Sequence, residues 1–453
     1  MRFVTTRTPR PSTSSGRPEL VEGHPAPGTP SVSFAHALFD GLAPDGGLYV
    51  PESIEAWSTE DLAALSSWSL GAIGTHVLEP FLRGELGRDR LRAIVDEALD
   101  FPMPLVEVEP GIYALELFHG PTLAFKDVGA RVMARLMAAL YVGDDHLTVL
   151  VATSGDTGGA VAHAYHNVRR TKVVVLYPDG RVSPTQEAQL TMFNGEDTNV
   201  RAYAVAGNFD DCQRLVKTAF ENPVLAARLT SANSINVGRL LPQMIYYAHA
   251  VAQLGAAPPA VFSTPSGNFG NLTAGLMMKR AGVPIASFVA ATNANDVVPA
   301  YLATGRFEPR ASIRTVANAM DVGNPSNFDR LMWLYDGHLD AIRRDVTGSR
   351  HADDEVRETI RRVYQERGYL LDPHSAIAYL GLKSYVASGF SRTFSRTNPA
   401  VFLATAHPAK FAEIVEPIIG HPIPKPKPLV DAIASPRHIV RIDATMDAVA
   451  KHL

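Results

Sequence analysis

Short apolar segments of strand length alternate with helical segments along most of this chain, and this alternation restricts the possible folds more than any other feature. Residues Thr148 to Ala152 read TVLVA and residues Lys172 to Leu176 read KVVVL, and a helical pattern follows each of them. The same order recurs around Ala260 to Ser263 and Ser287 to Ala291, and Val401 to Ala404 forms a late apolar run. Strands of this length that alternate with helices are typical of α/β layers around a largely parallel sheet. We therefore predict an α/β fold built on parallel strands.

The charge balance and the cysteine content exclude several classes of protein. The chain has 42 lysines and arginines against 46 acidic residues, a formal net charge of −4, which leaves no global footprint for nucleic acid or an anionic membrane. No apolar run reaches the roughly 18 residues of a membrane-spanning helix. The lone cysteine, Cys212, excludes an internal disulfide framework and a multi-cysteine zinc site. We expect a cytoplasmic protein that binds neither nucleic acid nor a membrane.

The segment from Thr8 to Pro30 is rich in Pro, Ser, Thr and Gly and lacks apolar periodicity. One interpretation is a sorting peptide, because four arginines precede the first acidic residue, Glu19. A secretory signal requires an apolar core, which is absent here, and the prolines would break an amphipathic transit helix. We favour a disordered surface insertion.

Three loops stand out because each of them links an extended segment to a helix. Such a loop aims backbone N–H groups and a positive helix end at whatever lies beyond the strand. In Ser266 to Asn271, SGNFGN, two glycines let successive N–H groups converge into a nest suited to a phosphate. The loop lacks the third glycine of a dinucleotide fingerprint and the Gly-Lys-Ser/Thr of a P-loop. A purely structural turn remains the alternative.

The second loop, Thr153 to Gly159, reads TSGDTGG and follows a predicted buried strand. Its hydroxyl and amide groups are suited to a carboxylate or a phosphate. The alternative is that Asp156 or Thr157 simply caps the next helix.

The third loop, His119 to Asp127, places Lys126 at the start of a predicted helix, after an apolar stretch. The helix dipole there favours anions, so a lysine at this position is electrostatically misplaced. Desolvation and the dipole both lower the pKa of such an amine, as a lysine that forms a Schiff base requires. The alternative is a solvated surface lysine.

Other markers of catalytic chemistry are weak or missing. His163 and His166 lie three residues apart on a predicted helix without an acidic or cysteine partner, so we predict no metal site. The chain contains no H-E-x-x-H, G-x-S-x-G or C-x-x-C motif.

Together the loops are more specific than any one alone. HGPTLAFKD, ATSGDTGGA, SANSINVGRLLPQ, PSGNFGN and ATAHPAKF occur in this order, and the combination resembles the threonine synthase family. The resemblance extends from Ser31 to about Phe411 and favours the branch with an extended N-terminal domain, as in enterobacteria and fungi. It implies a fold-type-II enzyme, similar to tryptophan synthase β, that depends on pyridoxal phosphate (PLP).

The resemblance also implies a domain organisation. A mostly helical N-terminal domain is expected at residues 1–100, with the insertion at about 8–30. A PLP-dependent catalytic region is expected at residues 101–453, with two three-layer lobes. The smaller lobe would span about 125–235, and the remainder would form the larger lobe.

Matching positions imply the residues that hold the cofactor. Lys126 matches the lysine that binds PLP covalently, and Thr405 matches the hydroxyl residue that faces the pyridine nitrogen. A neutral hydroxyl does not keep that nitrogen protonated as an aspartate would, so the ring is a weaker electron sink. The residues implied for the cofactor phosphate are Gly267, Asn268, Phe269, Gly270 and Asn271.

Two further sets are implied for the substrate. The residues implied for its carboxylate are Ser154, Gly155, Asp156 and Thr157. The residues implied for its phosphate are Asn233, Ser234, Asn236 and Arg239, with Arg131 and Arg181 as other basic candidates.

The reaction that the resemblance implies converts O-phospho-L-homoserine and water to L-threonine and phosphate, by γ-elimination and then β-addition. It is the last step of threonine biosynthesis, carried out by a monomer or a homodimer without a metal. One alternative is another fold-type-II amino-acid dehydratase or a phospho-amino-acid lyase. Another is a cofactor-free relative with a binding role.

Removal of residues 8–30 should leave turnover largely unchanged. In the family a short link joins the opening strand, matched by Met1 to Arg7, to the next helix, and about twenty extra residues here far exceed that connection length. Comparing turnover of the full-length and shortened proteins checks this, and a largely inactive shortened protein would contradict it.

Overall fold

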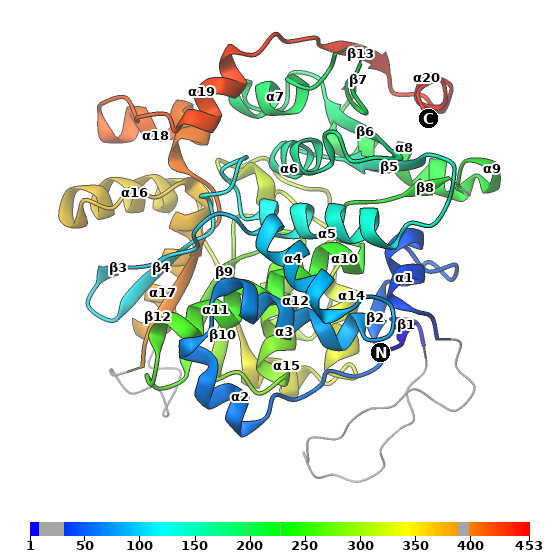
Figure 1. The fold of residues 1–453 in the computed structure, drawn as a ribbon. Coiled ribbons are helices and arrows are strands. Elements are labelled where there is room, and N and C mark those ends of the chain that lie inside the picture. Colours follow the sequence, from blue (N-terminus) through cyan, green and yellow to red (C-terminus); the bar gives the residue numbers. More distant parts are fainter. Residues whose placement is uncertain (9–30, 196, 227, 388–397) are drawn as a thin grey trace.

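Two largely parallel sheets, with helices packed against them, form the body of the molecule (Figure 1). The computed structural model describes residues 1–8, 31–195, 197–226, 228–387 and 398–453. Nearly all of the predicted insertion, residues 9–30, therefore lies outside the described residues. Within the described part of the chain, no helix is both long enough and apolar enough to cross a membrane.

The larger sheet has six strands. Helix α17 (Pro373–Ala387) packs on one face of it, and Tyr247 of α11 (Met244–Leu254) contacts the rings of Phe262 and Phe288 on the other face. Strands covered on both faces are apolar on both, which explains the continuous apolar runs in the sequence. All strand pairs are parallel except the antiparallel edge pair β3–β4. In spatial order the strands are β11 (Val346–Arg350), β10 (Ile285–Thr292), β9 (Ala260–Pro265), β12 (Ala400–Ala404), β4 (Ile112–Glu116) and β3 (Leu105–Glu109).

The smaller sheet has five parallel strands. Helix α6 (Asp156–Tyr165) covers one face and packs against α5 (Lys126–Leu140), while α8 (Phe209–Glu221) covers the other face. In spatial order the strands are β13 (Val440–Asp443), β7 (Val200–Ala206), β6 (Thr171–Pro178), β5 (Leu147–Ala152) and β8 (Leu229–Thr230).

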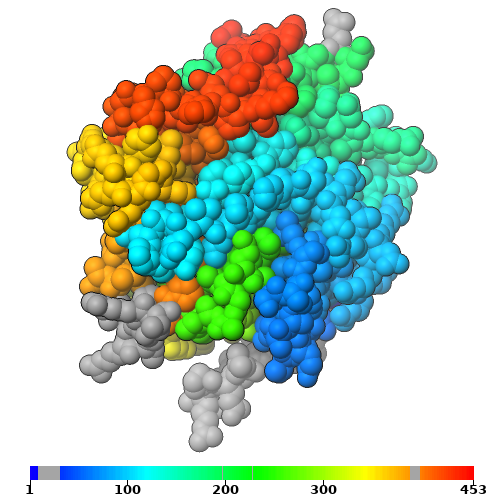
Figure 2. Space-filling model, turned by 60° about the vertical axis from the view of Figure 1, so that its left-hand side comes forward, coloured from blue at the N-terminus to red at the C-terminus, as the bar shows by residue number. Residues whose placement is uncertain are grey.

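The C-terminal segment completes this smaller sheet, so the predicted range of about 125–235 is incomplete. Strand β13 pairs with β7, and Val449 of α20 (Met446–Ala450) is buried in the core beneath α8. Figure 2 shows the C-terminal residues, in red and orange, lying over the edge of the molecule next to the green segments of this lobe. Strand β13 is short and largely exposed, and therefore gives almost no apolar pattern in the sequence.

The N-terminal hundred residues form a helical layer on the rest of the molecule. Helix α3 (Leu70–Leu82) packs on α11, and α4 (Arg88–Ala98) packs on α5. The apolar side chains of this layer belong to the same continuous core as residues of both sheets. The other N-terminal elements are β1 (Phe3–Thr5), α1 (Phe34–Asp40), β2 (Tyr49–Pro51), α2 (Thr59–Ala64) and the 3-10 helix η1 (Leu65–Ser67).

Most of the remaining elements connect or cover the two sheets. Among them, α12 begins directly after β9 and the 3-10 helix η4 follows β12, and both contribute to the cavity described below. Their bounds are α7 (Pro184–Thr191), α9 (Pro223–Ala226), α10 (Val237–Leu240), η2 (Leu241–Gln243), α12 (Gly270–Arg280), α13 (Val297–Thr304), η3 (Asn318–Met320), α14 (Phe328–Leu334), α15 (Leu339–Asp345), α16 (Asp353–Arg367), η4 (Pro408–Phe411), α18 (Ala412–Ile419) and α19 (Lys427–Ala434).

The α/β prediction is confirmed at the level of individual strands. The five apolar runs singled out in the sequence fall within β5, β6, β9, β10 and β12. Two of them, β5 and β9, lead into strand–helix loops where the sequence predicts chemistry, and β4 leads into the third.

Replacing Val449 by Asp should destabilise the smaller lobe. Val449 is fully buried, and a carboxylate there would lose its hydration without gaining a partner, which costs about 2 kcal/mol or more of unfolding free energy. Thermal unfolding of Val449→Asp measures the loss, and Ala450→Asp, at the exposed neighbouring position, is the matched control. Equal melting temperatures for the two variants would show that α20 contributes no packing.

Candidate active site

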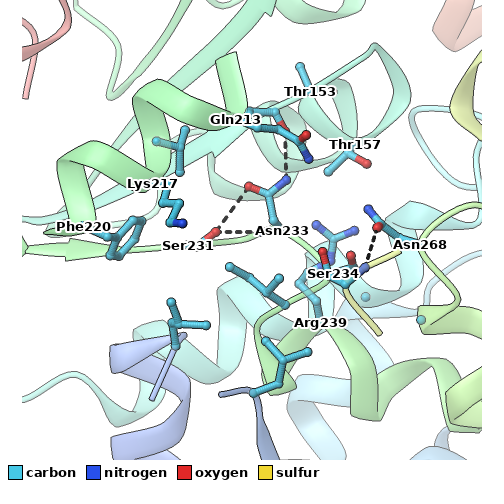
Figure 3. A pocket seen from close by; sticks show the side chains of 18 of the residues that line it. Thr153, Thr157, Gln213, Lys217, Phe220, Ser231, Asn233, Ser234, Arg239 and Asn268 are labelled. Carbon is cyan, nitrogen blue, oxygen red and sulfur yellow. Dashed lines mark hydrogen bonds between the residues drawn. The ribbon is translucent and has the colours of Figure 1, made fainter. Parts of the chain in front are cut away.

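A cavity of about 1640 Å³ lies where the carboxyl ends of β5, β9 and β12 meet. Ligands of open parallel sheets bind at this edge. In Figure 3, Thr153 and Thr157 lie above Asn268, and the Asn233 amide points toward the end of β5, where it donates to the Ala152 carbonyl. Lys217 and Phe220 of α8 extend the lining outward. All three strand–helix loops predicted from the sequence contribute residues to this one cavity.

Lys126 is the first residue of α5 and lines the cavity. Its position is set by the preceding residues, because Ala124 forms a bridge with Ala406 and the Phe125 N–H donates to the Thr405 carbonyl at 2.9 Å. The structure therefore holds Lys126 beside Thr405, at the end of β12.

The surroundings of Lys126 favour its neutral amine. Burial lowers the pKa of Lys126 to about 8; Asp156 opposes the shift, and the charges of Lys410 and Arg239 add to it. Amines with a lowered pKa are the usual nucleophiles toward carbonyl groups. This environment is the one that the sequence predicted for a lysine that forms a Schiff base.

The loop from Gly267 to Asn271 forms a cup at the start of α12. Phe269 has a left-handed backbone with φ 62°, and a Cβ on Gly267 would lie 2.9 Å from both the Ala319 carbonyl oxygen and Met320 Cα. Among the described residues, no hydrogen bond is formed by the backbone N–H groups of 267–271. Unsatisfied N–H groups at a helix start bind phosphate well, so the cup fits the phosphate of PLP.

Two buried arginines add positive charge near the cavity. Arg239 lines the cavity and donates to the Ala232 carbonyl, while its buried Nε has no partner. Arg330 lies behind the cup and donates to Asn327, whose N–H in turn donates to the Asn268 carbonyl. Burial lowers the pKa of Arg239 to about 10 and that of Arg330 to about 9, so both remain cationic at neutral pH. Buried cations held only by neutral oxygens favour an anion nearby.

The loop after β5 is held by hydrogen bonds within it, and its residues have different roles. Thr153 Oγ1 accepts from the N–H groups of Gly155 at 3.0 Å and Gly158 at 2.8 Å. Gly155 has φ 139°, and a Cβ there would lie 2.4 Å from Gln186, so this position requires glycine. Ser154, Asp156 and Thr157 line the cavity, whereas Gly155 shapes the turn without lining it.

The prediction of Asn236 as a substrate residue is corrected by its contacts. Asn236 is fully buried; its Nδ2 donates to the Leu38 and Ser231 carbonyls, and its Oδ1 caps α10 through the Gly238 N–H. It does not line the cavity, whereas Asn233, Ser234 and Arg239 do.

The alternative basic candidates also lie elsewhere. Arg131 donates to the Ala98 carbonyl and pairs with Asp100, which ties α5 to the end of α4. Arg181 is exposed and does not line the cavity.

Sequence reasoning missed two buried charged groups near the cavity. Lys410 pairs with Asp156 at 2.8 Å, and Arg330 joins β2 to the loop that contains Ser234 by donating to the Tyr49 and Ser234 carbonyls. Lys410 lies within the ATAHPAKF motif, and its place directly after a buried strand was the signal available. Arg330 lies on a short helix without any such signal.

His163, His166 and Cys212 do not line this cavity. Within the described residues, no group of three or more His, Cys, Asp or Glu side chains is arranged to hold a metal ion. The His166 ring stacks on Phe193, and His163 meets the same ring edge-on. Cys212 is buried, and burial raises the pKa of its thiol to about 12.

Comparison with known proteins agrees with this geometry. Three family models match the chain: threonine synthase N terminus at residues 27–99, pyridoxal-phosphate dependent enzyme at 100–398, and threonine synthase C-terminal at 384–453. The threonine synthase of Haemophilus influenzae is 46% identical, covering 88% of this chain and 91% of that protein. That of Escherichia coli K12 is 41% identical, covering 93% of this chain and 96% of that protein.

The chain belongs to the threonine synthase family. The crystal structure of the Escherichia coli threonine synthase superposes with a TM-score of 0.87 at 38% identity, covering 100% of this chain and 99% of that chain. A PLP-bound threonine synthase from Brucella melitensis superposes equally well, with a TM-score of 0.87 at 36% identity over 100% of this chain and 98% of that chain. The predictions of family, of PLP dependence and of a fold-type-II enzyme are therefore confirmed.

In the PLP-free protein, covalent binding of PLP should become faster with rising pH, with a midpoint near pH 8 and a plateau above about pH 9. Only the neutral amine of Lys126 attacks the aldehyde, and burial lowers the pKa of that amine to about 8. The rate of appearance of the visible absorption of bound PLP, measured from pH 6 to 10, checks this, with Lys126→Ala as the control. A midpoint at the ordinary value, near 10.5, would contradict the environment described here.

Proposed function

We propose that this protein converts O-phospho-L-homoserine and water to L-threonine and phosphate, the last step of threonine biosynthesis. One observation carries the proposal: a single cavity contains a nucleophilic lysine, a helix-start phosphate cup and a separate cationic region at Arg239. A phosphorylated substrate that reacts beside a phosphorylated cofactor requires two anion sites and one amine. Membership of the threonine synthase family supports the same reaction.

The residues proposed to hold PLP lie on three elements. Lys126 would bind it covalently, residues 267–271 would receive its phosphate, and Thr405 would face the ring nitrogen. Bound PLP supplies an electron sink that stabilises negative charge on the substrate carbon atoms. Since Thr405 is neutral, it offers a hydrogen bond without the charge that would keep the nitrogen protonated.

Lys126 is the residue proposed to move protons. With PLP and the substrate bound, the Lys126 amine would be available to the substrate α-carbon. It takes the α-proton as a general base and returns a proton as a general acid. A pKa of about 8 leaves both protonation states well populated near neutral pH, as this double role requires.

The ends of the substrate are held by different segments in this proposal. Ser154 and Thr157, at the start of α6, would grip the carboxylate with hydroxyl and N–H groups and with the positive helix end. Arg239, with Asn233 and Ser234, would hold the γ-phosphate and stabilise it as it leaves. A β-proton is lost as the phosphate leaves, and the γ-carbon then gains a proton to become the methyl group. Water adds its hydroxyl group at the β-carbon, and a proton returns to the α-carbon to give threonine.

We place this reaction in the cytoplasm and assign it to a monomer or a homodimer. Lys126, the cup and Arg239 all come from one chain, so no proposed step draws a residue from a second copy.

Lys126→Ala should lower threonine formation from O-phospho-L-homoserine by at least about 1000-fold, because both the covalent anchor and the general base are removed. Threonine and phosphate release are measured together, with Lys451→Ala, at an exposed position near the C-terminus, as the control. Production of 2-oxobutyrate instead of threonine by the wild-type protein would favour a dehydratase or lyase. Retained threonine formation by Lys126→Ala would overturn the assignment of the site.

A further inference from the structure

A second lysine lies against the active site, and the proposed function gives it no role. Lys410 belongs to η4, five residues after Thr405 in the chain, and its side chain is 0% exposed. Its Nζ lies 2.8 Å from Asp156 Oδ1 and donates to the Thr122 carbonyl at 2.8 Å. Burying an ammonium group is costly, so a fully buried lysine requires partners of this kind.

The partners of Lys410 come from different parts of the fold. Asp156 opens α6 on the smaller sheet, Thr122 belongs to the loop that leads to Lys126, and Lys410 follows β12 of the larger sheet. One ammonium group therefore connects both sheets and the segment that carries Lys126. A buried ion pair is weak evidence for stability, because similar apolar groups often stabilise as well or better. Its location suggests a role in the site.

The charge on Asp156 is the link to Lys126. Burial by itself raises the pKa of Asp156, but the positive charges of Lys410 and Lys126 outweigh it and hold that pKa below its ordinary value. The carboxylate is therefore ionised beside Lys126. Without Lys410 it would stabilise the protonated form of Lys126, which is neither a nucleophile nor a base.

The other charged and titratable groups near the pair are few among the described residues. Arg239 acts on Lys126, and His374 acts on Asp156. Asp127, which is fully buried, accepts from the Thr122 N–H and hydroxyl group, and burial raises its pKa to about 6. His407 lies three residues before Lys410 in the chain; burial lowers the pKa of His407 to about 4, and the charge of Lys410 adds to that shift.

We propose that Lys410 is a positioning residue for the reaction: it fixes the Asp156 carboxylate across the two lobes and neutralises its charge toward Lys126. The inference rests on the proposed function, in which Lys126 is the nucleophile and the proton carrier. In this arrangement Gln186 also binds Asp156, because Gln186 Nε2 donates to Asp156 Oδ1 at 3.1 Å. Lys410 itself does not line the cavity.

The test is a set of charge-changing variants of the PLP-bound enzyme, read by the visible absorption of bound PLP as a function of pH. Lys410→Met removes the cation that compensates Asp156. The midpoint of the absorption change should then move upward by about one pH unit or more, because the uncompensated Asp156 carboxylate favours the protonated state of the Lys126 nitrogen. Asp156→Asn leaves Lys410 unpaired and should move the midpoint downward. The double variant removes both charges and should return it toward the wild-type value.

Steady-state rates provide a second readout. For Lys410→Met, kcat at neutral pH should fall at least about tenfold and recover as the pH rises, while KM changes less. Lys410→Arg, which keeps the charge, should restore most of the pH profile. Lys383→Met is the matched control, because Lys383 is a half-exposed lysine paired with Glu109 away from the cavity.

Each outcome decides the proposal. If Lys410→Met does not fold, the downward shift expected for Asp156→Asn and its reversal in the double variant still test the proposal. Variants that are merely less stable, with unchanged midpoints and pH profiles, would reduce Lys410 to a structural residue. If the wild-type enzyme forms threonine while all variants titrate alike, only the role of Lys410 fails. If the wild-type enzyme forms no threonine, the proposed function itself fails.

Discussion

This site depends on one constraint: its buried cationic side chains outnumber the carboxylates that contact them. Within the described residues, Arg239 and Arg330 donate only to neutral oxygens, and the charges of Arg239, Lys410 and Asp156 all act on Lys126. Burying a cation away from water costs free energy unless an anion lies close to it. The fold therefore builds a cavity whose charges are balanced only with anions present, which suits a phosphorylated cofactor and a phosphorylated amino acid. The local nature of this excess explains why the net charge of the chain shows nothing of it.

The N-terminal layer takes part in the same arrangement. Arg330 donates to the Tyr49 carbonyl in β2 and to the carbonyls of Ser234 and Ile235 in the loop that lines the cavity. The Leu38 carbonyl in α1 accepts from Asn236 of that loop. The first hundred residues thus help to shape the segment proposed to hold the substrate phosphate. Their apolar core is continuous with that of the sheets, and a change in this layer is expected to reach the site through these backbone contacts.

The parts of the structure that the sequence predicted are those determined by local patterns. Each of three features can be read from a few neighbouring residues: the buried strands, the glycine-rich cup and the misplaced charge of Lys126. Hydrophobic periodicity, glycine spacing and the start of a helix are all local properties of the sequence. Asn236, Lys410 and strand β13 depend on long-range packing. The amide of Asn236 resembles a ligand group until the Leu38 carbonyl is seen to occupy it. Lys410 reads as a surface lysine until Asp156 is brought to it from more than two hundred residues away in the chain.

Asp156 shows why such a long-range pair has chemical consequences. A carboxylate side chain at the start of α6 would repel a substrate carboxylate, so the gripping role implied for the whole loop cannot extend to this side chain. The structure turns it toward Lys410 and Gln186 instead, which leaves the hydroxyl groups of Ser154 and Thr157 and the helix start for the substrate. The loop thereby separates two functions that its sequence presents as one. In the proposed site, anion capture would fall to its neutral groups and control of the Lys126 charge to its acid.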